Sequence, residues 1–197
     1  MVQRIAFLAF PGLTLLDLVG AYDVLRRVPL MGIDQSVTHR IVGTKASLED
    51  ETGFAFHPDG IFEELKAFDL LVVPGGLGTR RLMSDERFLE YLRSWGKSRP
   101  LASVCTGSLL LGRAGYLKSR RATGHAGSFD LLAPMCKEVV RDERVIEDGH
   151  VTTAGGVSSS IDLGLHLVTR YWGEEARERI AAVMEYRGYG APAPGPA

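Results

Sequence analysis

The sequence predicts a single α/β domain built on an open, mostly parallel sheet with helices on both faces. Short apolar runs alternate with amphipathic runs almost throughout the chain, and this alternation is typical of a parallel sheet covered by helices. Several predicted strands end in small-residue turns. The length of 197 residues suits one substantial core, because a domain of about 150 residues already buries roughly 70% of its unfolded surface.

The predicted first strand runs from Ile5 to Phe10. It contains β-branched and aromatic residues and is closed by Pro11-Gly12, as expected of a buried strand. A helix follows, with Thr14 and Asp17 spaced as in a capping box. The residues predicted to share the apolar face of this helix are Leu15, Leu18, Val19 and Tyr22.

The middle of the chain contains one strong strand signal and two weaker ones. Val37 to Val42 and the region around Phe54 give the weaker signals, with Gly43 and Gly53 as turns. Asp69 to Val73 is a strongly apolar run followed by Pro74-Gly75-Gly76. We therefore expect a second buried strand that ends in a glycine pair.

The second half continues the alternation. The remaining predicted elements are, in chain order, a helix over 84–95, a strand over 101–104, helices over 109–114 and 128–133, extended segments over 139–147 and 151–153, a helix containing Ile161, Leu165 and Val168, and a charged surface helix over 174–185. Residues 1–190 are predicted to form the domain. Residues 191–197, rich in Pro and Gly, are predicted to be a disordered tail.

Composition limits the partners and the compartment. With 23 basic and 24 acidic residues, the chain has no electrostatic signature of nucleic-acid or anionic-membrane binding, so a small molecule is the expected partner. Asp17 and Asp23 interrupt the most apolar stretch, which excludes a membrane-spanning helix. Two cysteines are too few for a disulfide scaffold, and no signal peptide is apparent, so we expect a cytoplasmic protein.

Cys105 is the strongest candidate for chemistry. It lies between the apolar run Leu101 to Val104 and a second apolar run that starts with small residues, an order that predicts strand, sharp turn and helix. A side chain at such a corner is held clear of the sheet, and the N-H groups of the new helix favour its anion. We therefore predict a thiolate-prone nucleophile. The alternative is a buried thiol that packs as a small apolar group.

Three small-residue turns, at Pro74-Gly75-Gly76, at Cys105 and at Ala154-Gly155-Gly156, are expected to meet in one crevice at the carboxyl ends of the strands, where ligands bind in such sheets. The N-H groups of Gly75, Gly76 and Thr106 are predicted to form an oxyanion-type pocket next to the thiol. Gly156 is predicted to line the same crevice. A glycine pair after a strand is also common as a simple turn, and close packing also explains Gly156.

Asp17 and His125 are the candidates for acid-base chemistry or for lining the site. Asp17 has apolar neighbours on both sides, where a buried carboxylate needs a partner. It is either a proton-exchanging partner of the thiol or the acid of the capping box. His125 follows a predicted short strand and is a candidate lining residue, although lone histidines are more often structural. Cys136 is predicted to be structural. No metal-ligand spacing, Walker loop or dinucleotide fingerprint occurs, so neither metal nor nucleotide cofactor is expected.

The motif set resembles the ThiJ/PfpI superfamily over nearly the whole chain and, within it, most resembles the isocyanide hydratases. The motifs that carry the resemblance are Phe10-Pro11, Leu16-Asp17-Leu18-Val19-Gly20, Asp23-Val24-Leu25, Val73-Pro74-Gly75-Gly76, Ser103-Val104-Cys105-Thr106-Gly107-Ser108, Gly112-Arg113-Ala114-Gly115 and Arg121-Ala122-Thr123. The resemblance implies a flavodoxin-like sandwich with a nucleophile elbow, a homodimer and a cofactor-free site built on Cys105.

Two residues point to the hydratases within the superfamily. Most members place Glu on the first helix, whereas the hydratases have Asp, as at Asp17. The hydratases also have Thr after the nucleophile, as at Thr106, where PfpI-type proteases typically have His. Ala122-Thr123-Gly124-His125-Ala126 departs from the hydratase pattern by a threonine and a bulky aromatic, and Ser158-Ser159-Ser160 also differs. These departures leave the size of the pocket and the choice of substrate open.

The resemblance implies hydration of an isocyanide to an N-substituted formamide. Cys105 would attack a small electrophilic substrate, Asp17 would shuttle protons, and the intermediate would be covalent. Two alternatives remain: glyoxalase-like hydration of small aldehydes such as methylglyoxal, and redox or ligand sensing through Cys105 without turnover. Related domains also occur in AraC-type regulators, but no DNA-binding module follows residue 190.

Overall fold

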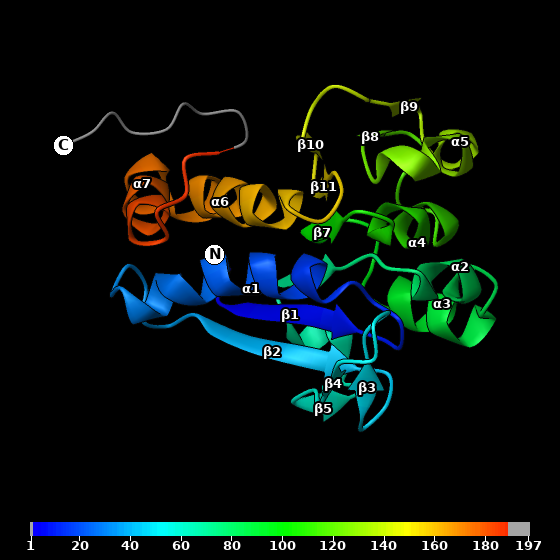
Figure 1. Ribbon diagram of the computed structural model, residues 1–197, viewed down its shortest axis with the longest axis horizontal. Coiled ribbons are helices and arrows are strands. Elements are labelled where there is room, and N and C mark those ends of the chain that lie inside the picture. Colours follow the sequence, from blue (N-terminus) through cyan, green and yellow to red (C-terminus); the bar gives the residue numbers. More distant parts are fainter. Residues whose placement is uncertain (1, 189–197) are drawn as a thin grey trace.

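The computed structural model describes residues 2–188 (Figure 1). The predicted tail over 191–197 lies outside the described residues. The strands are β1 (Arg4–Ala9), β2 (Thr38–Gly43), β3 (Leu48–Glu49), β4 (Ala55–Phe56), β5 (Gly60–Ile61), β6 (Leu70–Val73), β7 (Leu101–Val104), β8 (Arg121–Ala122), β9 (Glu138–Val139), β10 (Val145–Asp148) and β11 (Val151–Ala154). The α-helices are α1 (Leu15–Leu30), α2 (Gly78–Leu82), α3 (Glu86–Arg93), α4 (Gly107–Arg113), α5 (Phe129–Leu132), α6 (Ser159–Trp172) and α7 (Glu174–Val183).

The main sheet has seven strands in the order β10-β11-β7-β6-β1-β2-β5. Every described pairing in it is parallel except that between β10 and β11. Strands β6, β7 and β11 are buried throughout, and β1 is buried after Arg4, as a parallel sheet covered on both faces requires. The prediction of a mostly parallel α/β fold is confirmed.

Chain direction places helices on both faces of this sheet. From β1 the chain crosses through α1 to β2, whereas from β6 it crosses through α2 and α3 to β7 in the opposite direction along the sheet. Since parallel crossovers are right-handed, the two connections lie on opposite faces. Figure 1 shows α1 grouped with α6 and α7, and α2 grouped with α3 and α4.

Two expectations about α1 are wrong. Val19 does not lie on the buried face that it was expected to share with Leu18. Val19 is 38% exposed, whereas the buried residues of α1 include Leu18, Ala21, Val24, Leu25 and Val28. The reason is that α1 is enclosed on two sides, by the sheet and by α6. A Cβ at Gly20 would lie 2.0 Å from the Ser160 hydroxyl oxygen, so the two helices pack in close contact.

The capping box at the start of α1 is also absent. The Thr14 side chain makes no cap hydrogen bond; its hydroxyl donates instead to the Glu51 carboxylate at 2.8 Å. The Asp17 carboxylate turns inward and accepts the Gly75 N-H at 3.0 Å. Both side chains therefore bind loops that are distant in sequence, and neither is left to cap the helix.

Other boundaries differ modestly from the predictions. The helix predicted over 84–95 is α3, which begins at Glu86 behind an Asp85 N-cap, and α2 precedes it. The extended segment predicted over 139–147 is divided between β9 and β10. Across residues 2–188, no helix combines the length and apolarity needed to cross a bilayer.

Candidate active site

Cys105 lies on a sharp turn between β7 and α4. Its φ is 57°, a left-handed conformation that non-glycine residues seldom adopt and that is found at functional sites. Its N-H donates to the carbonyls of Ala154 and Gly155 at the end of β11. The turn also needs Gly107, because a Cβ there would lie 2.5 Å from the Val73 carbonyl oxygen. The predicted strand, turn and helix are therefore present.

Asp17 lies against the thiol from the first turn of α1. Its side chain is fully buried, and its Oδ1 has no hydrogen-bond partner of good geometry among the described residues. Cys105, 4% exposed, is close enough for the thiol and the carboxyl to shift each other's pKa. The Val157 N-H interacts with both groups, and the Thr106 N-H interacts with the sulfur. The site therefore pairs one sulfur with one carboxyl group, held by backbone donors.

Burial controls the protonation of this pair. Burial raises the pKa of Asp17 to about 7, against the opposing effect of the Gly75 N-H. Burial and the Asp17 charge raise the pKa of Cys105 to about 12, against the effect of the Thr106 and Val157 N-H groups. The expectation of a thiolate-prone sulfur is wrong for the resting site, because desolvation and the neighbouring carboxylate outweigh the helix N-terminus.

A cavity of about 180 Å³ opens over the thiol. Four of its lining residues were predicted from the sequence, namely Gly76, Cys105, Thr106 and His125. The structure adds Thr14, Glu51, Leu77, Arg80 and Val157. Asp17 and Gly75 lie behind the cavity wall, and Gly156 packs beneath His125, where an added Cβ would lie 2.9 Å from the ring Cδ2.

The predicted donor role of the glycine pair is wrong. Gly75 donates its N-H to Asp17, and Gly76 donates its N-H to the Thr106 hydroxyl oxygen at 2.9 Å. The glycines are needed for space instead. A Cβ at Gly75 would lie 2.6 Å from the Thr106 nitrogen, and one at Gly76 would lie 2.3 Å from the Thr14 nitrogen.

The N-H groups that face the sulfur belong to Thr106 and Val157. The sequence gives no sign of the role of Val157, because its contribution is a backbone N-H. The conformation that aims it, with φ of 40°, leaves no signature in a valine. Glu51 lies on a loop distant in sequence from the other site residues. It lines the cavity, and its carboxylate accepts the Thr14 hydroxyl at 2.8 Å and the Leu77 N-H at 3.2 Å.

His125 lies on the rim of the cavity. Its Nδ1 accepts the Gly127 N-H at 3.1 Å, so in the neutral ring the proton is on Nε2. Cys136 is half-buried at the end of a short 3₁₀ helix and does not line the cavity. Residues 2–188 contain no cluster of three His, Cys, Asp or Glu side chains suited to a metal ion.

Comparison with known proteins gives the family. Residues 3–170 match the DJ-1/PfpI family. The chain belongs to the DJ-1/PfpI family. It is 38% identical over 195 residues to an isonitrile hydratase from Pseudomonas putida, an alignment that covers 98% of this chain and 81% of the relative. The predicted resemblance to the ThiJ/PfpI superfamily is confirmed.

Other matches include a transcriptional regulator and two solved structures. The transcriptional regulator CdhR from Pseudomonas aeruginosa is 28% identical over 92% of this chain, which spans 54% of the regulator. A crystal structure of a ThiJ/PfpI family protein from Pseudomonas syringae superposes with a TM-score of 0.82 at 30% identity, covering 99% of this chain and 78% of that one. Drosophila melanogaster DJ-1beta shares the fold, with a TM-score of 0.82 at 21% identity over 95% of this chain and 100% of its own.

Proposed function

We propose that this protein hydrates an isocyanide to an N-substituted formamide, with Cys105 as nucleophile and Asp17 as the proton carrier. The observation that carries the proposal is the burial of Asp17 against the Cys105 thiol, with a carboxyl pKa of about 7. A carboxyl group with such a pKa can both accept and return a proton near neutral pH. The 38% identity to an isonitrile hydratase supports the substrate class.

In the first step the sulfur attacks the terminal isocyanide carbon while the Asp17 carboxylate takes the thiol proton. A thiol whose pKa is about 12 is a weak nucleophile until a base removes its proton. The S–C bond forms, and the carbon lone pair then takes the proton back from Asp17. The product is a thioimidate, Cys105–S–CH=N–R, with no net gain or loss of protons.

In the second step water adds to the thioimidate carbon. Asp17 removes a proton from this water and delivers it to the nitrogen, so that Asp17 is again a carboxylate. The tetrahedral intermediate then breaks its C–S bond, its hydroxyl proton passes to the sulfur through Asp17, and the carbonyl forms. The balance of both steps is one isocyanide and one water consumed for one formamide released.

Backbone groups around the sulfur stabilise the charged states that form during this reaction. The Thr106 and Val157 N-H groups lower the pKa of Cys105 relative to burial alone, so they stabilise the transient sulfur anion. The Thr106 hydroxyl bonds to the Gly76 loop and positions that N-H. His125 on the rim offers Nε2-H to the substrate or the attacking water.

Formamide production from an aryl isocyanide, followed by chromatography and mass spectrometry, tests the proposal. We expect turnover by wild type and none by Cys105→Ala. The matched control is Cys136→Ala, which removes a thiol outside the cavity and should keep full activity. Mass spectrometry of the quenched reaction should detect the substrate mass added to Cys105. Full activity in Cys105→Ala, or faster turnover of methylglyoxal than of isocyanide, would contradict the proposal.

We also propose that the chain forms a homodimer through the exposed face of α1. Leu16 is 42% exposed and Val19 is 38% exposed. With Tyr22, Ile161 and Met184 they line a hollow of about 380 Å³. Burial of such an apolar face against a second copy would stabilise association.

A further inference from the structure

A second hollow, separate from the cavity over Cys105, lies at the carboxyl edge of β1 and β2. Its volume is about 310 Å³, and it shares no lining residue with the Cys105 cavity. Pro11 follows β1 and Lys45 follows β2, and the two strands end level with each other because Ala9 pairs with Gly43. In open parallel sheets, the carboxyl edge of the strands is where ligands bind. The hollow therefore lies at the edge of the sheet that binds ligands in such folds, and its lining decides what it can bind.

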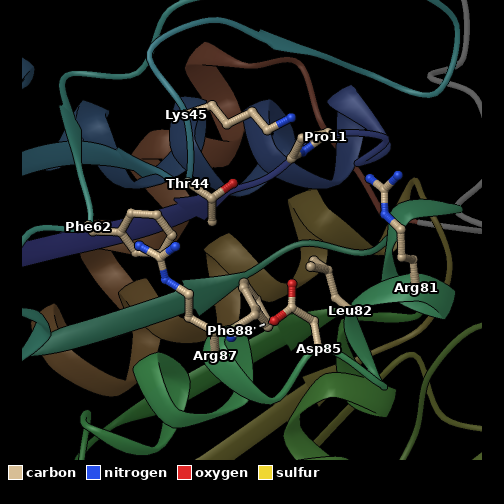
Figure 2. A pocket seen from close by; sticks show the side chains of 9 residues that line it. All are labelled: Pro11, Thr44, Lys45, Phe62, Arg81, Leu82, Asp85, Arg87 and Phe88. Atoms are coloured by element: carbon tan, nitrogen blue, oxygen red, sulfur yellow. Dashed lines mark hydrogen bonds between the residues drawn. The ribbon is translucent and has the colours of Figure 1, made fainter.

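Three cations surround this hollow. Figure 2 shows the side chains of Lys45, Arg81 and Arg87 on three sides of it, contributed by the loop after β2, by α2 and by α3. None of the three forms an ion pair or side-chain hydrogen bond with any residue from 2 to 188. Most other arginines of the described chain are paired with carboxylates or carbonyls, so three unpaired cations around one hollow form a distinct basic site.

One acid and one hydroxyl complete the polar lining. The Asp85 Oδ1 accepts the Phe88 N-H as the cap of α3, which leaves its other oxygen for a donor. The Thr44 hydroxyl makes no hydrogen bond within the described residues. Lys45, Arg81 and Arg87 against Asp85 leave an excess of two positive charges. A phosphate monoester carries about −1.5 to −2 charges at pH 7 and matches this excess better than a single carboxylate does.

The aromatic wall of the hollow is held in place. The Arg87 guanidinium lies 5.3 Å from the Phe62 ring centroid, a cation-π contact that orients its N-H groups. Phe62 in turn packs edge-on against Tyr91, with the two ring centroids 5.0 Å apart. Its φ of 46° is a strained conformation that the surrounding contacts must maintain.

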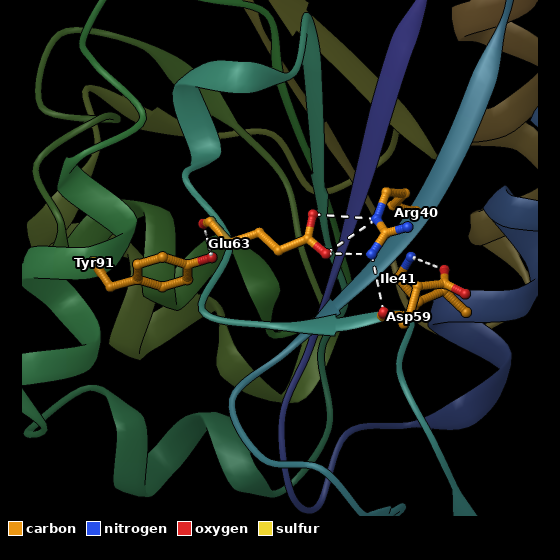
Figure 3. A network of polar contacts seen from close by, with 5 residues as sticks. All are labelled: Arg40, Ile41, Asp59, Glu63 and Tyr91. Carbon is orange, nitrogen blue, oxygen red and sulfur yellow. Dashed lines mark hydrogen bonds and ion pairs between the residues drawn. The ribbon is translucent and has the colours of Figure 1, made fainter.

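Figure 3 shows the network that maintains it. The Arg40 guanidinium binds both Glu63 carboxylate oxygens and donates to the Asp59 carbonyl at 2.9 Å. The Tyr91 hydroxyl donates to the Glu63 carbonyl at 2.7 Å. These bonds fix the segment on both sides of Phe62. The aromatic wall against which Arg87 packs is therefore preorganised, which lowers the entropy cost of binding a ligand.

We propose that this hollow binds the phosphate monoester of a small hydroxylated molecule. Lys45, Arg81 and Arg87 would hold the phosphate through charge-assisted hydrogen bonds. Asp85 and Thr44 would bind the hydroxyl groups. A further hollow shares Pro11 and Arg81 with this site and shares Glu51 and Leu77 with the Cys105 cavity, so the two sites lie along one continuous edge of the molecule.

Calorimetric titration at low salt tests this site, with glycerol 3-phosphate as the probe and with glycerol and inorganic phosphate as comparators. We expect saturable one-site binding of glycerol 3-phosphate, weaker binding of inorganic phosphate and none of glycerol. The triple variant Lys45→Gln, Arg81→Gln, Arg87→Gln should lose at least about tenfold in affinity. All three side chains are exposed, so the variant should keep the wild-type melting temperature.

The matched control removes three exposed lysines outside the hollow, as Lys97→Gln, Lys118→Gln, Lys137→Gln. It should bind within about twofold of wild type, since screened distant charges contribute little. Cys105→Ala should also bind normally, because this site does not depend on the hydratase chemistry. Amide NMR of wild type should show shifts at residues 44–46, 62 and 81–88.

Four outcomes would overturn the proposal. They are absence of saturable binding to wild type, equal affinity for inorganic phosphate, an equal loss in the control variant, and NMR shifts centred on the Cys105 cavity.

Discussion

At Asp17, burial and hydrogen bonding act on the pKa in opposite directions. Loss of water around the carboxyl raises the pKa, whereas the N-H groups of Gly75 and Val157 lower it, with a result of about 7. The group thus keeps a proton in acid and loses it close to neutral pH. That behaviour suits a residue that must take a proton from the thiol and return it to carbon.

The pH dependence of catalysis should reflect this pKa. We expect kcat/KM for formamide formation to rise as pH increases through about 7, because the carboxylate form of Asp17 is the one that accepts the thiol proton. Asp17→Asn should lower activity by about 10²-fold or more. Its residual activity should lack this rise, as measured in initial-rate pH profiles. An unchanged profile in Asp17→Asn would show that another group is the base.

Asp17 should also weaken the fold at neutral pH. Its pKa rises on folding from 3.8 to about 7, so the native state binds the proton more tightly and loses stability as pH increases between these values. The expected cost above pH 7 approaches about 4 kcal/mol. Asp17→Asn should therefore be more stable than wild type at pH 8 and similar at pH 3.5 in urea titrations. A variant less stable than wild type at pH 8 would contradict this.

At the scale of elements, the turn after β6 is the part of the fold that allows the site to assemble. It carries Gly75 and Gly76 into contact with α1 and the nucleophile turn at once. Backbone approaches this close exclude a side chain. The glycine pair is required because three elements meet there.

Gly76→Ala tests the packing of this turn. Gly76 has φ of 120°, and a Cβ would lie 2.3 Å from the Thr14 nitrogen. Gly53→Ala is the control, since Gly53 has φ of 95° and nothing within 4 Å of an added Cβ. Both variants strain the backbone, but Gly76→Ala should lose about 1–3 kcal/mol more in the free energy of unfolding and most of its turnover. Equal losses in the two variants would show that packing is not the cause.

The exposed face of α1 gives a second prediction at this scale. Leu16→Glu with Val19→Glu should convert a dimer to a monomer in light scattering, because both side chains line the apolar hollow. Leu30→Glu is the control, since Leu30 lies at the other end of α1 and is 68% exposed. It should leave the mass unchanged. A monomeric wild type would refute the interface.

At the scale of the whole molecule, one hydrophobic core joins the sheet to helices on both faces. The core includes β1, β6 and β7 and the inner faces of α1 and α6. It also includes the buried face of α3 and Trp95, which follows α3. No second core separates from it within residues 2–188. A single core of this kind predicts one cooperative unfolding unit.

This cooperativity is measurable with two probes. In Trp172→Phe, fluorescence reports the buried Trp95 on one side of the sheet, whereas circular dichroism reports all helices. We expect both to give the same midpoint and slope in urea. Two separate transitions would show that the helix layers unfold independently and would contradict the single-domain prediction.

Local patterns are enough to predict the architecture and the nucleophile. Strand, turn and helix around Cys105 are contiguous in sequence, and the alternation of apolar runs does not depend on distant contacts. Asp17 was identifiable as a partner through family resemblance and its apolar neighbours. The misassigned side-chain roles of Thr14 and Asp17 involve distant segments: Thr14 bonds to Glu51, and Asp17 bonds to Gly75, 58 residues away.

Residue types thus establish which groups are available, whereas the folded arrangement establishes what state they are in. Thiol and carboxyl have ordinary pKa values in water. Here both values rise because neighbouring elements exclude solvent from them. The same packing turns the Val157 N-H inward and commits those of Gly75 and Gly76 to internal bonds. Desolvation and donor direction depend on which atoms surround a group, and that is decided only when the chain is folded.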